Sequence, residues 1–412
     1  MIEAFYSPGV DVSRFRCGPL KPHIDEFAGQ LSRLGYSTHA ARWKIRLVAD
    51  LSRWLERRQR GTRDLNEAQI GTFLRTRKQQ RLLRRGDRHT LSRLLHQLRQ
   101  AGVTPRPREG VSHHPIDQIT ADYTRFLSQQ RGLSPATIAH YLPVAQRFLQ
   151  TRFGTGRICL GKLRGADVTG FILRDGAKVS ARRSQLVGTA LRSFFGFLTQ
   201  TGQTAVNLAA VVPTMAHWPG PQLPKFLEPE QVEKLLRGCN QNIPAGRRDY
   251  AVLLLLARLG LRGGEVARLC LEDINWEAGE VLVRGKSARE DRLPLLPEVG
   301  QALARYLKED RPPCPCRSVF LRIQAPRQGF SSSAAIRNVL RRALVRVDLH
   351  PAHQGAHLLR CSLATQMLRR GASLTQIGEV LRHQLIQTTE IYAKVDIATL
   401  RALAQPWPGG AR

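Results

Sequence analysis

The sequence predicts a mainly α-helical protein of three domains, the last of which also contains a small β-sheet. Three observations support this fold class. The 412 residues can form two or three domains of ordinary size. Apolar residues recur at helical spacing through most of the chain, whereas apolar and polar residues alternate around 281–295, as in a β-hairpin. We expect an N-terminal helical domain at 1–105, a second at 112–205, a linker at 206–225 and a third domain at 226–412.

The first two domains resemble each other. GYSTHAARWKIRLVADLSRWL at 35–55 and GLSPATIAHYLPVAQRFL at 132–149 both begin with Gly-x-Ser and continue with an amphipathic pattern. Two further helices align in the same order, with these apolar residues opposite one another: Leu65, Ile70, Phe73, Leu91, Leu94, Leu95 and Leu98 against Leu163, Val168, Phe171, Leu191, Phe194, Phe195 and Leu198. Gly102 and Gly202 follow the last helix of each copy. We interpret this as a duplicated helical bundle, although any two amphipathic bundles share some of this pattern.

The third domain begins after a Pro- and Gly-rich stretch at 211–226, and a similar stretch at 105–115 separates the first two. Its leucine-rich segment AVLLLLARLGL at 251–261 predicts a buried helix. A membrane span would need about 18 or more apolar residues, and this segment is shorter and contains Arg258. From Ala334 onward the pattern is helical again.

The charge balance indicates a polyanionic partner. Lys and Arg number 64 against 32 Asp and Glu, a formal charge of +32. Nucleic acid is the expected partner, because such a charge repels itself unless a polyanion neutralises it. The N-terminus lacks the basic-then-apolar order of a secretory signal, so we expect the seven cysteines to stay reduced in the bacterial cytoplasm, with the protein at the nucleoid. Cys314 and Cys316 lack a second ligand pair at zinc-site spacing, and we expect no metal and no cofactor.

The segment HLLRCSLATQMLRRGASLTQIGEVLRHQLIQTTEIY at 357–392 concentrates groups suited to phosphate chemistry. His357 and Arg360 are one helical turn apart and can face one pocket. A second short helix begins after Ser373 and ends near His383, and Tyr392 follows nine residues later. Each of these residues alone is more often structural. Together, at this spacing and with matching segments upstream, they predict an active site.

This pattern resembles the catalytic domain of the tyrosine recombinase (phage integrase) family, of the type found in transposons and other mobile elements. The family's His-x-x-Arg, Ala-Thr, Gly, His and Tyr positions are matched by His357, Arg360, Ala364, Thr365, Gly371, His383 and Tyr392. Upstream, ARLGLRGGEVARLCLEDINW resembles the first arginine box and places its arginine at Arg262. VLVRGKSAREDRLPL resembles the β-hairpin whose lysine is Lys286. The resemblance covers about 226–396, and 115–203 as the SAM-like core-binding domain. One departure is Arg382, which replaces a glycine and could crowd the helix end or contact a phosphate.

The resemblance implies a role for each residue. Arg262 and Arg360 would stabilise the charge that builds on the phosphate, since paired guanidinium groups do this without a metal. A phenol with a pKa of about 10 needs assistance at neutral pH, so His357 would be the base for the nucleophile Tyr392. Lys286 would protonate the departing 5′ oxygen, and His383 would support the phosphate. The product would be a 3′-phosphotyrosyl intermediate.

The expected function is therefore site-specific recombination for integration, excision or transposition. The resemblance implies double-stranded DNA as substrate and a homotetramer on paired sites, or a hetero-assembly with related recombinases. The tail at 397–405 would supply a short helix to a neighbouring subunit. Two alternatives stay open: a type IB topoisomerase-like enzyme, and a catalytically impaired DNA-binding accessory subunit.

Overall fold

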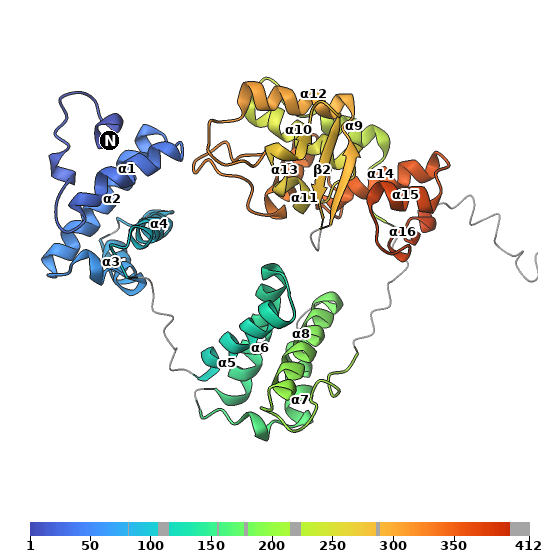
Figure 1. The fold of residues 1–412 in the computed structure, drawn as a ribbon, viewed down its shortest axis with the longest axis horizontal. Coiled ribbons are helices and arrows are strands. Elements are labelled where there is room, and N and C mark those ends of the chain that lie inside the picture. The colour runs from blue at the N-terminus through green and yellow to red at the C-terminus, as the bar shows by residue number, and fades with distance from the viewer. Residues whose placement is uncertain are drawn as a thin grey trace, which may run out of the picture. The chain divides into compact units, whose positions relative to one another are not determined.

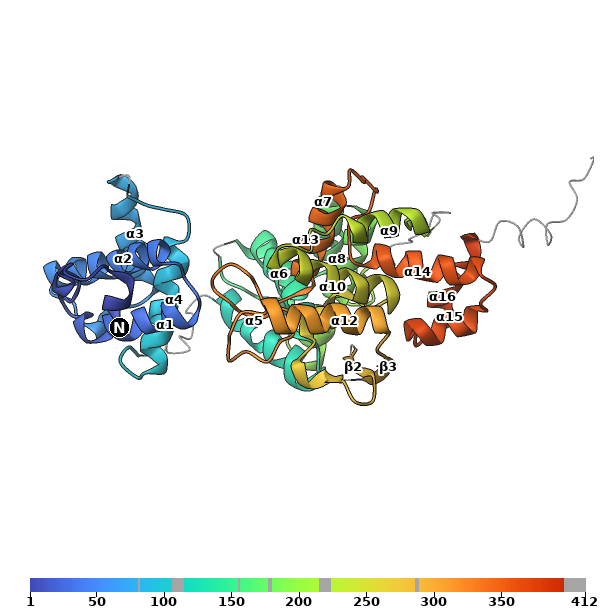
Figure 2. The same cartoon turned by 90° about the horizontal axis from the view of Figure 1, so that it is seen from above.

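The computed structural model describes residues 1–80, 82–105, 115–154, 156–176, 180–214, 224–285 and 289–395. The chain divides into two compact units, one of residues 106–221 and the other of residues 1–105 and 222–412. The fold class is confirmed: helices dominate, and one small antiparallel sheet lies in the C-terminal region (Figures 1 and 2). Within the described ranges no helix combines the length and apolar character that a membrane crossing requires.

Residues 1–105 form a bundle of four α-helices. They are α1 (Ile24–Arg33), α2 (Thr38–Arg57), α3 (Glu67–Gln79) and α4 (Asp87–Gln100). Side chains cap two of these helices, since Ser37 accepts a hydrogen bond from the Ala40 amide and Asn66 accepts one from the Gln69 amide. A continuous apolar core fills the bundle, including the leucines of α4 that the sequence predicted to be buried.

Residues 115–214 repeat this plan. The helices are α5 (Pro115–Arg125), α6 (Pro135–Phe153), α7 (Gly165–Gly176) and α8 (Ala181–Gln200). Every apolar residue that the alignment placed opposite its counterpart is buried in its own core. Gly102 and Gly202 both follow the last helix with φ of +70°, a conformation that favours glycine. The predicted duplication of the helical bundle is therefore seen in the packing as well as in the sequence.

The core of the second bundle extends past its last helix. Leu208 and Val212, from the segment predicted as linker, are buried in it. Aromatic rings of Tyr123, Phe148 and Phe194 pack edge to face in its centre. Residues 206–214 thus belong to the packed bundle, because their apolar side chains complete its core.

The C-terminal region packs around α10 (Pro244–Arg258). This helix contacts α9 (Pro229–Arg237), α11 (Gly263–Arg268), α12 (Pro297–Arg305), α13 (Ser333–Arg346) and α14 (His357–Arg369). Residues 251–257 are buried, as expected of a central helix. A smaller apolar cluster lies under α14, α15 (Leu374–Leu381) and α16 (Gln387–Glu390).

The predicted hairpin is present. Strands β1 (Ile274–Asn275), β2 (Glu280–Arg284) and β3 (Glu290–Pro294) form one antiparallel sheet in that order. Val281 lies opposite Leu293, and Val281 and Val283 point into the core. The turn between β2 and β3 holds Lys286, which lies outside the described residues, as does the predicted tail helix at 397–405.

Truncating the centre of α10 tests this core. Leu254→Ala should lower the free energy of unfolding by about 2–5 kcal/mol, because it removes buried methyl groups and leaves a cavity. Val345→Ala, at a side chain that is 62% exposed, should change it by less than about 0.5 kcal/mol. Urea unfolding followed by circular dichroism measures both, and equal effects would contradict the assigned core.

Candidate active site

The end of α10 positions the first arginine of the predicted site. Gly260 has a φ of +58°, and a Cβ there would lie 2.7 Å from a methyl carbon of Leu381. A glycine is therefore required for the tight turn between α10 and α11. Arg262 follows as the residue that precedes the first turn of α11. Its side chain is 45% exposed, so its guanidinium group is accessible to a ligand.

Glu265 fixes the direction of Arg262. One carboxylate oxygen accepts a hydrogen bond from Nη1 of Arg262 at 2.9 Å, and the other accepts one from the Arg262 backbone amide at 2.8 Å. Burial alone would raise the pKa of Glu265, but these bonds and the charge of Arg382 lower it, so the carboxylate is ionised. The exposed guanidinium of Arg262 is therefore held by the buried, ionised carboxylate of Glu265.

Arg262 and His357 line one hollow of about 420 Å³ together with Arg337 of α13. Burial, followed by the charges of Arg360 and Arg262, lowers the pKa of His357. Its imidazole is therefore neutral at pH 7 and able to accept a proton. Sequence reasoning missed Arg337, whose only signal was the basic spacing along α13.

Arg360 lies one helical turn after His357 on α14 and is 1% exposed. Its Nη1 donates to the Gly260 carbonyl at 2.5 Å, and its Nη2 donates to the Leu381 carbonyl. Burial, and then the charges of Arg262 and Arg382, lower its pKa to about 10, which leaves it positive at pH 7. Arg360 thus ties the end of α10 to the end of α15 while adding charge to the site.

His383 and Tyr392 come from the C-terminal cluster. Nδ1 of His383 lies 2.8 Å from the hydroxyl of Thr389, and its ring stacks on that of Tyr392 with centroids 6.4 Å apart. Tyr392 is fully buried, and its hydroxyl lies 3.7 Å from Sγ of Cys361 on α14. Burial, followed by the neighbouring Cys361, raises its pKa. The phenol is therefore protonated and packed against α14 rather than exposed in the hollow.

Arg382 does not contact solvent as a phosphate ligand would. Its side chain is 4% exposed and its Nη2 donates to Glu265 at 2.8 Å. Its backbone closes α15 in the left-handed region, with φ of +55°. That conformation costs a residue with a Cβ roughly 1–2 kcal/mol. The helix end is not crowded, because the side chain turns inward to Glu265.

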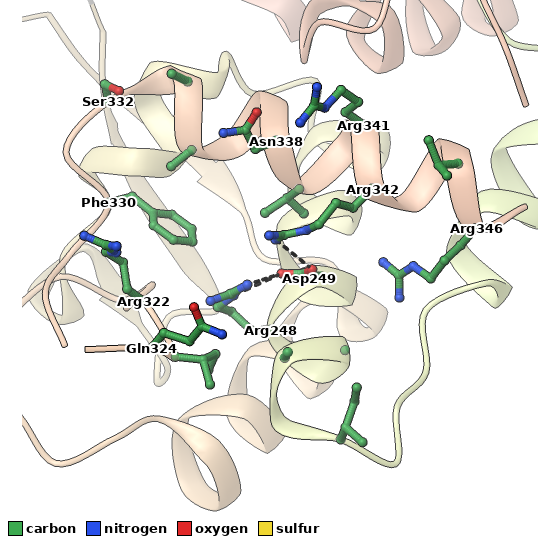
Figure 3. A pocket seen from close by; sticks show the side chains of 18 of the residues that line it. Arg248, Asp249, Arg322, Gln324, Phe330, Ser332, Asn338, Arg341, Arg342 and Arg346 are labelled. Atoms are coloured by element: carbon green, nitrogen blue, oxygen red, sulfur yellow. Dashed lines mark hydrogen bonds and ion pairs between the residues drawn. The ribbon is translucent and has the colours of Figure 1, made fainter. Parts of the chain in front are cut away.

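A second, larger hollow of about 1200 Å³ lies between the start of α10, the loop at 322–324 and α13. Figure 3 shows Asp249 between the guanidinium groups of Arg248 and Arg342, with ion pairs of 2.6 and 3.4 Å. Arg322, Arg341 and Arg346 also line it and form no ion pair with any described residue. The hollow is therefore strongly positive. In the described part of the chain no cluster of His, Cys, Asp and Glu could hold a metal ion.

Comparison with known proteins identifies the family to which this chain belongs. Residues 225–398 match the model of the phage integrase family. The integrase/recombinase y4rA of Sinorhizobium fredii is 42% identical over 410 residues, which are 99% of each chain. Tyrosine recombinase XerD of Listeria monocytogenes is 30% identical over 289 residues, which are 68% of this chain and 95% of XerD.

Solved structures agree on the fold. The XerH site-specific recombinase bound to palindromic difH substrate has a TM-score of 0.54 at 20% identity, covering 82% of this chain and 94% of that one. The Tn1549 transposon integrase in complex with circular intermediate DNA has a TM-score of 0.51 at 18% identity, covering 71% and 99%. The chain belongs to the phage integrase family of tyrosine recombinases. It is an enzyme that breaks and rejoins DNA strands.

Stability should depend on the protonation of His383. Burial, then the charges of Arg360, Arg262, His357 and Arg382, lower its pKa from 6.5 to about 4. Between these values the unfolded chain binds more protons, so the contribution is complete above pH 6.5 and is lost as pH falls towards 4. His383→Gln should therefore reduce the fall in melting temperature between pH 6.5 and 4.5.

His96→Gln, at an exposed histidine of α4, is the matched control and should leave the pH dependence as in the wild type. Differential scanning calorimetry at each pH provides the measurement. A His383→Gln curve that runs parallel to the wild-type curve would contradict the depressed pKa.

Proposed function

We propose that this enzyme is a site-specific recombinase that cleaves DNA through Tyr392 and forms a 3′-phosphotyrosyl intermediate. The observation that carries the proposal is the hollow shared by Arg262 and His357, with the buried charge of Arg360 one helical turn after His357 on α14. Such a hollow matches the needs of a phosphodiester whose non-bridging oxygens gain charge during attack.

Each residue then has one task. Oη of Tyr392 attacks the phosphorus, its proton passes to neutral His357, and the bond to the 5′ oxygen breaks as Lys286 protonates that oxygen. Arg262 and Arg360 stabilise the phosphate because guanidinium groups stay charged throughout. His383 orients the phosphate and the Tyr392 ring. One phosphodiester is exchanged for another of similar energy, so the reaction consumes no nucleotide and no metal, and a strand hydroxyl reverses it.

The position of Tyr392 adds a condition. In the free chain its hydroxyl faces Cys361 and is shielded from solvent. Attack therefore requires α16 and the residues after it to move so that the phenol reaches the hollow. The same burial is the observation that favours the second candidate, a DNA-binding accessory subunit in which Tyr392 never leaves its packed position.

The assembly follows from the chemistry. Exchange of strands between two duplexes needs two pairs of nucleophiles, which supports a homotetramer on paired sites or a hetero-assembly with related recombinases. Relatives named integrase/recombinase and a transposon integrase among the similar folds support a mobile element as the biological context. The expected location is the nucleoid in the bacterial cytoplasm, where the formal charge of +32 is neutralised by DNA.

The larger arginine hollow would contact the DNA backbone beside the scissile phosphate. The N-terminal half of α13 separates it from the hollow of Arg262, so the two form neighbouring positive surfaces on one helix. Arg322, Arg341 and Arg346, which form no ion pair with a described residue, are available to replace counterions on phosphates. These contacts would position the duplex without reading its bases.

Replacing the nucleophile tests the proposal. Tyr392→Phe should bind DNA like the wild type, since charge and ring are kept, yet form no covalent adduct. The substrate is nicked DNA from the regions flanking the coding sequence, and denaturing electrophoresis detects protein on a 3′ end. Tyr250→Phe, which removes a phenol hydroxyl on α10, should still form the adduct. Cleavage by Tyr392→Phe would disprove the assignment, and binding without cleavage by wild type would favour the accessory subunit.

Salt titrations test the arginine hollow. Arg341→Ala should reduce the slope of log K against log salt concentration by about 1, because one phosphate contact is lost. Arg305→Ala should leave the slope unchanged, since Arg305 is already paired with Glu309 on the surface. Fluorescence anisotropy with a labelled duplex measures both slopes. Identical slopes for Arg341→Ala and wild type would contradict the proposal that this hollow contacts DNA.

A further inference from the structure

Arg382 has an unexpected combination of properties. It holds a left-handed backbone conformation at the end of α15, where a glycine would be free of strain. Only two other described residues besides glycines have positive φ, Gln59 and Asp348. Its guanidinium group is nevertheless enclosed, which means that a large charged side chain is buried at a strained position. Such a cost persists only where the surrounding contacts compensate for it.

Those contacts lead to the active site. Nη2 of Arg382 donates to Oε2 of Glu265 at 2.8 Å, and the same carboxylate holds Arg262 through two hydrogen bonds. The backbone carbonyl of Arg382 also accepts a longer bond of 3.5 Å from Nη2 of Arg262. Arg382 therefore contacts Arg262 directly and through Glu265, and it is the residue immediately before His383.

A further contact reaches the hairpin. Nε of Arg382 lies 3.7 Å from a carboxylate oxygen of Asp291 on β3. Asp291 is three residues after the segment 286–288, which contains Lys286 and lies outside the described residues. The Arg382 guanidinium thus lies between α11 and β3, two elements that are distant in sequence from α15.

The charges explain why an arginine suits this place. Without Arg382, Arg262 and Glu265 would form a neutral pair, and the carboxylate would offset the positive charge needed at a phosphate. With Arg382 the three side chains together carry one net positive charge. The nearby Asp291 does not cancel it, because Asp291 is also paired with Arg289 at 2.9 Å. Because Glu265 is buried, water screens these charges poorly, and the second guanidinium has a large effect on the first.

We propose that Arg382 is a positioning residue for DNA cleavage: it shares Glu265 with Arg262, and so holds the exposed guanidinium in place while leaving these side chains with a net positive charge. This inference rests on the proposed function of Arg262. It differs from a capping role, in which any residue that tolerates the left-handed conformation would serve equally well.

Arg382→Gly separates the two roles. A glycine relieves the backbone strain, so a capping role predicts unchanged cleavage. The positioning role predicts a single-turnover cleavage rate that is about 10- to 100-fold lower on nicked DNA. The dissociation constant for DNA should change by less than about threefold, because the side chain is enclosed and makes no contact with the duplex. Cleavage at the wild-type rate by Arg382→Gly would overturn the proposal.

A matched pair guards against loss of folding. Arg382→Lys and Arg382→Gln both keep a polar side chain and the same backbone strain, but only lysine restores the charge beside Glu265. Lysine should recover at least about fivefold of the cleavage rate relative to glutamine, while equal rates would overturn the proposal. Asp348→Gly is the control for strain relief, since Asp348 shares the positive φ but is 91% exposed and lies outside the site. It should cleave like the wild type.

Coupling through Glu265 is measured with a double-mutant cycle. If Arg382 acts through the carboxylate, Glu265→Gln and Arg382→Gln together should be less harmful than the product of the two single effects. If the two substitutions instead act independently, so that their effects on the rate multiply, the inference that Arg382 acts through Glu265 is overturned. Failure of wild type to cleave would instead count against the proposed function, so the two failures are distinguishable.

Discussion

Glu265 is the carboxylate on which the geometry of the site depends. It is buried at the start of α11 and bonded to two arginines, one that is exposed at the hollow and one that is enclosed. Removing Glu265 would leave the enclosed Arg382 guanidinium without its hydrogen-bonded carboxylate, which is far more costly than losing a surface pair. This one carboxylate joins α11 to the end of α15, more than a hundred residues later in the sequence. It also holds the guanidinium of Arg262 in its accessible position.

Arg360 adds a second connection of the same kind. Its guanidinium group binds backbone carbonyls at the ends of α10 and α15 instead of a carboxylate. The charge is therefore retained rather than neutralised. Burial lowers its pKa but leaves it protonated, so it adds positive charge near Arg262. Structural and electrostatic roles coincide in this residue, since the same hydrogen bonds that hold the turn also orient the charge.

The proposed nucleophile, Tyr392, is held apart from these charges. Tyr392 packs against Cys361 and His383, and its raised pKa is a consequence of that apolar setting. A short helix, α16, and the segment after it carry the tyrosine. Few apolar contacts hold such a short element, so its movement is the least costly rearrangement by which the phenol can meet a phosphate. Separation of nucleophile and charge before DNA binding would suppress unwanted strand cleavage.

The sequence alone determined much of this protein. Apolar spacing predicted the helices, the repeat and the hairpin, because periodicity reports which face of an element is buried. Spacing along α14 and α15 also predicted candidate site residues, and the structure places His357 and Arg360 one turn apart on α14. The identical φ of Gly102 and Gly202 was implied by their matching positions after each bundle's last helix.

Tertiary structure alone decided how these residues are used. Whether Arg382 contacts a phosphate or Glu265 depends on the distance between α15 and α11. That distance cannot be predicted from the local sequence of either helix. The same is true of Arg337, which shares a hollow with Arg262 only because α13 packs beside α11. The burial of Tyr392 likewise arises because α16 packs on α15 and Tyr392 contacts Cys361 of α14. Local sequence specifies the elements and their faces, whereas charge environment and exposure arise only when distant elements meet.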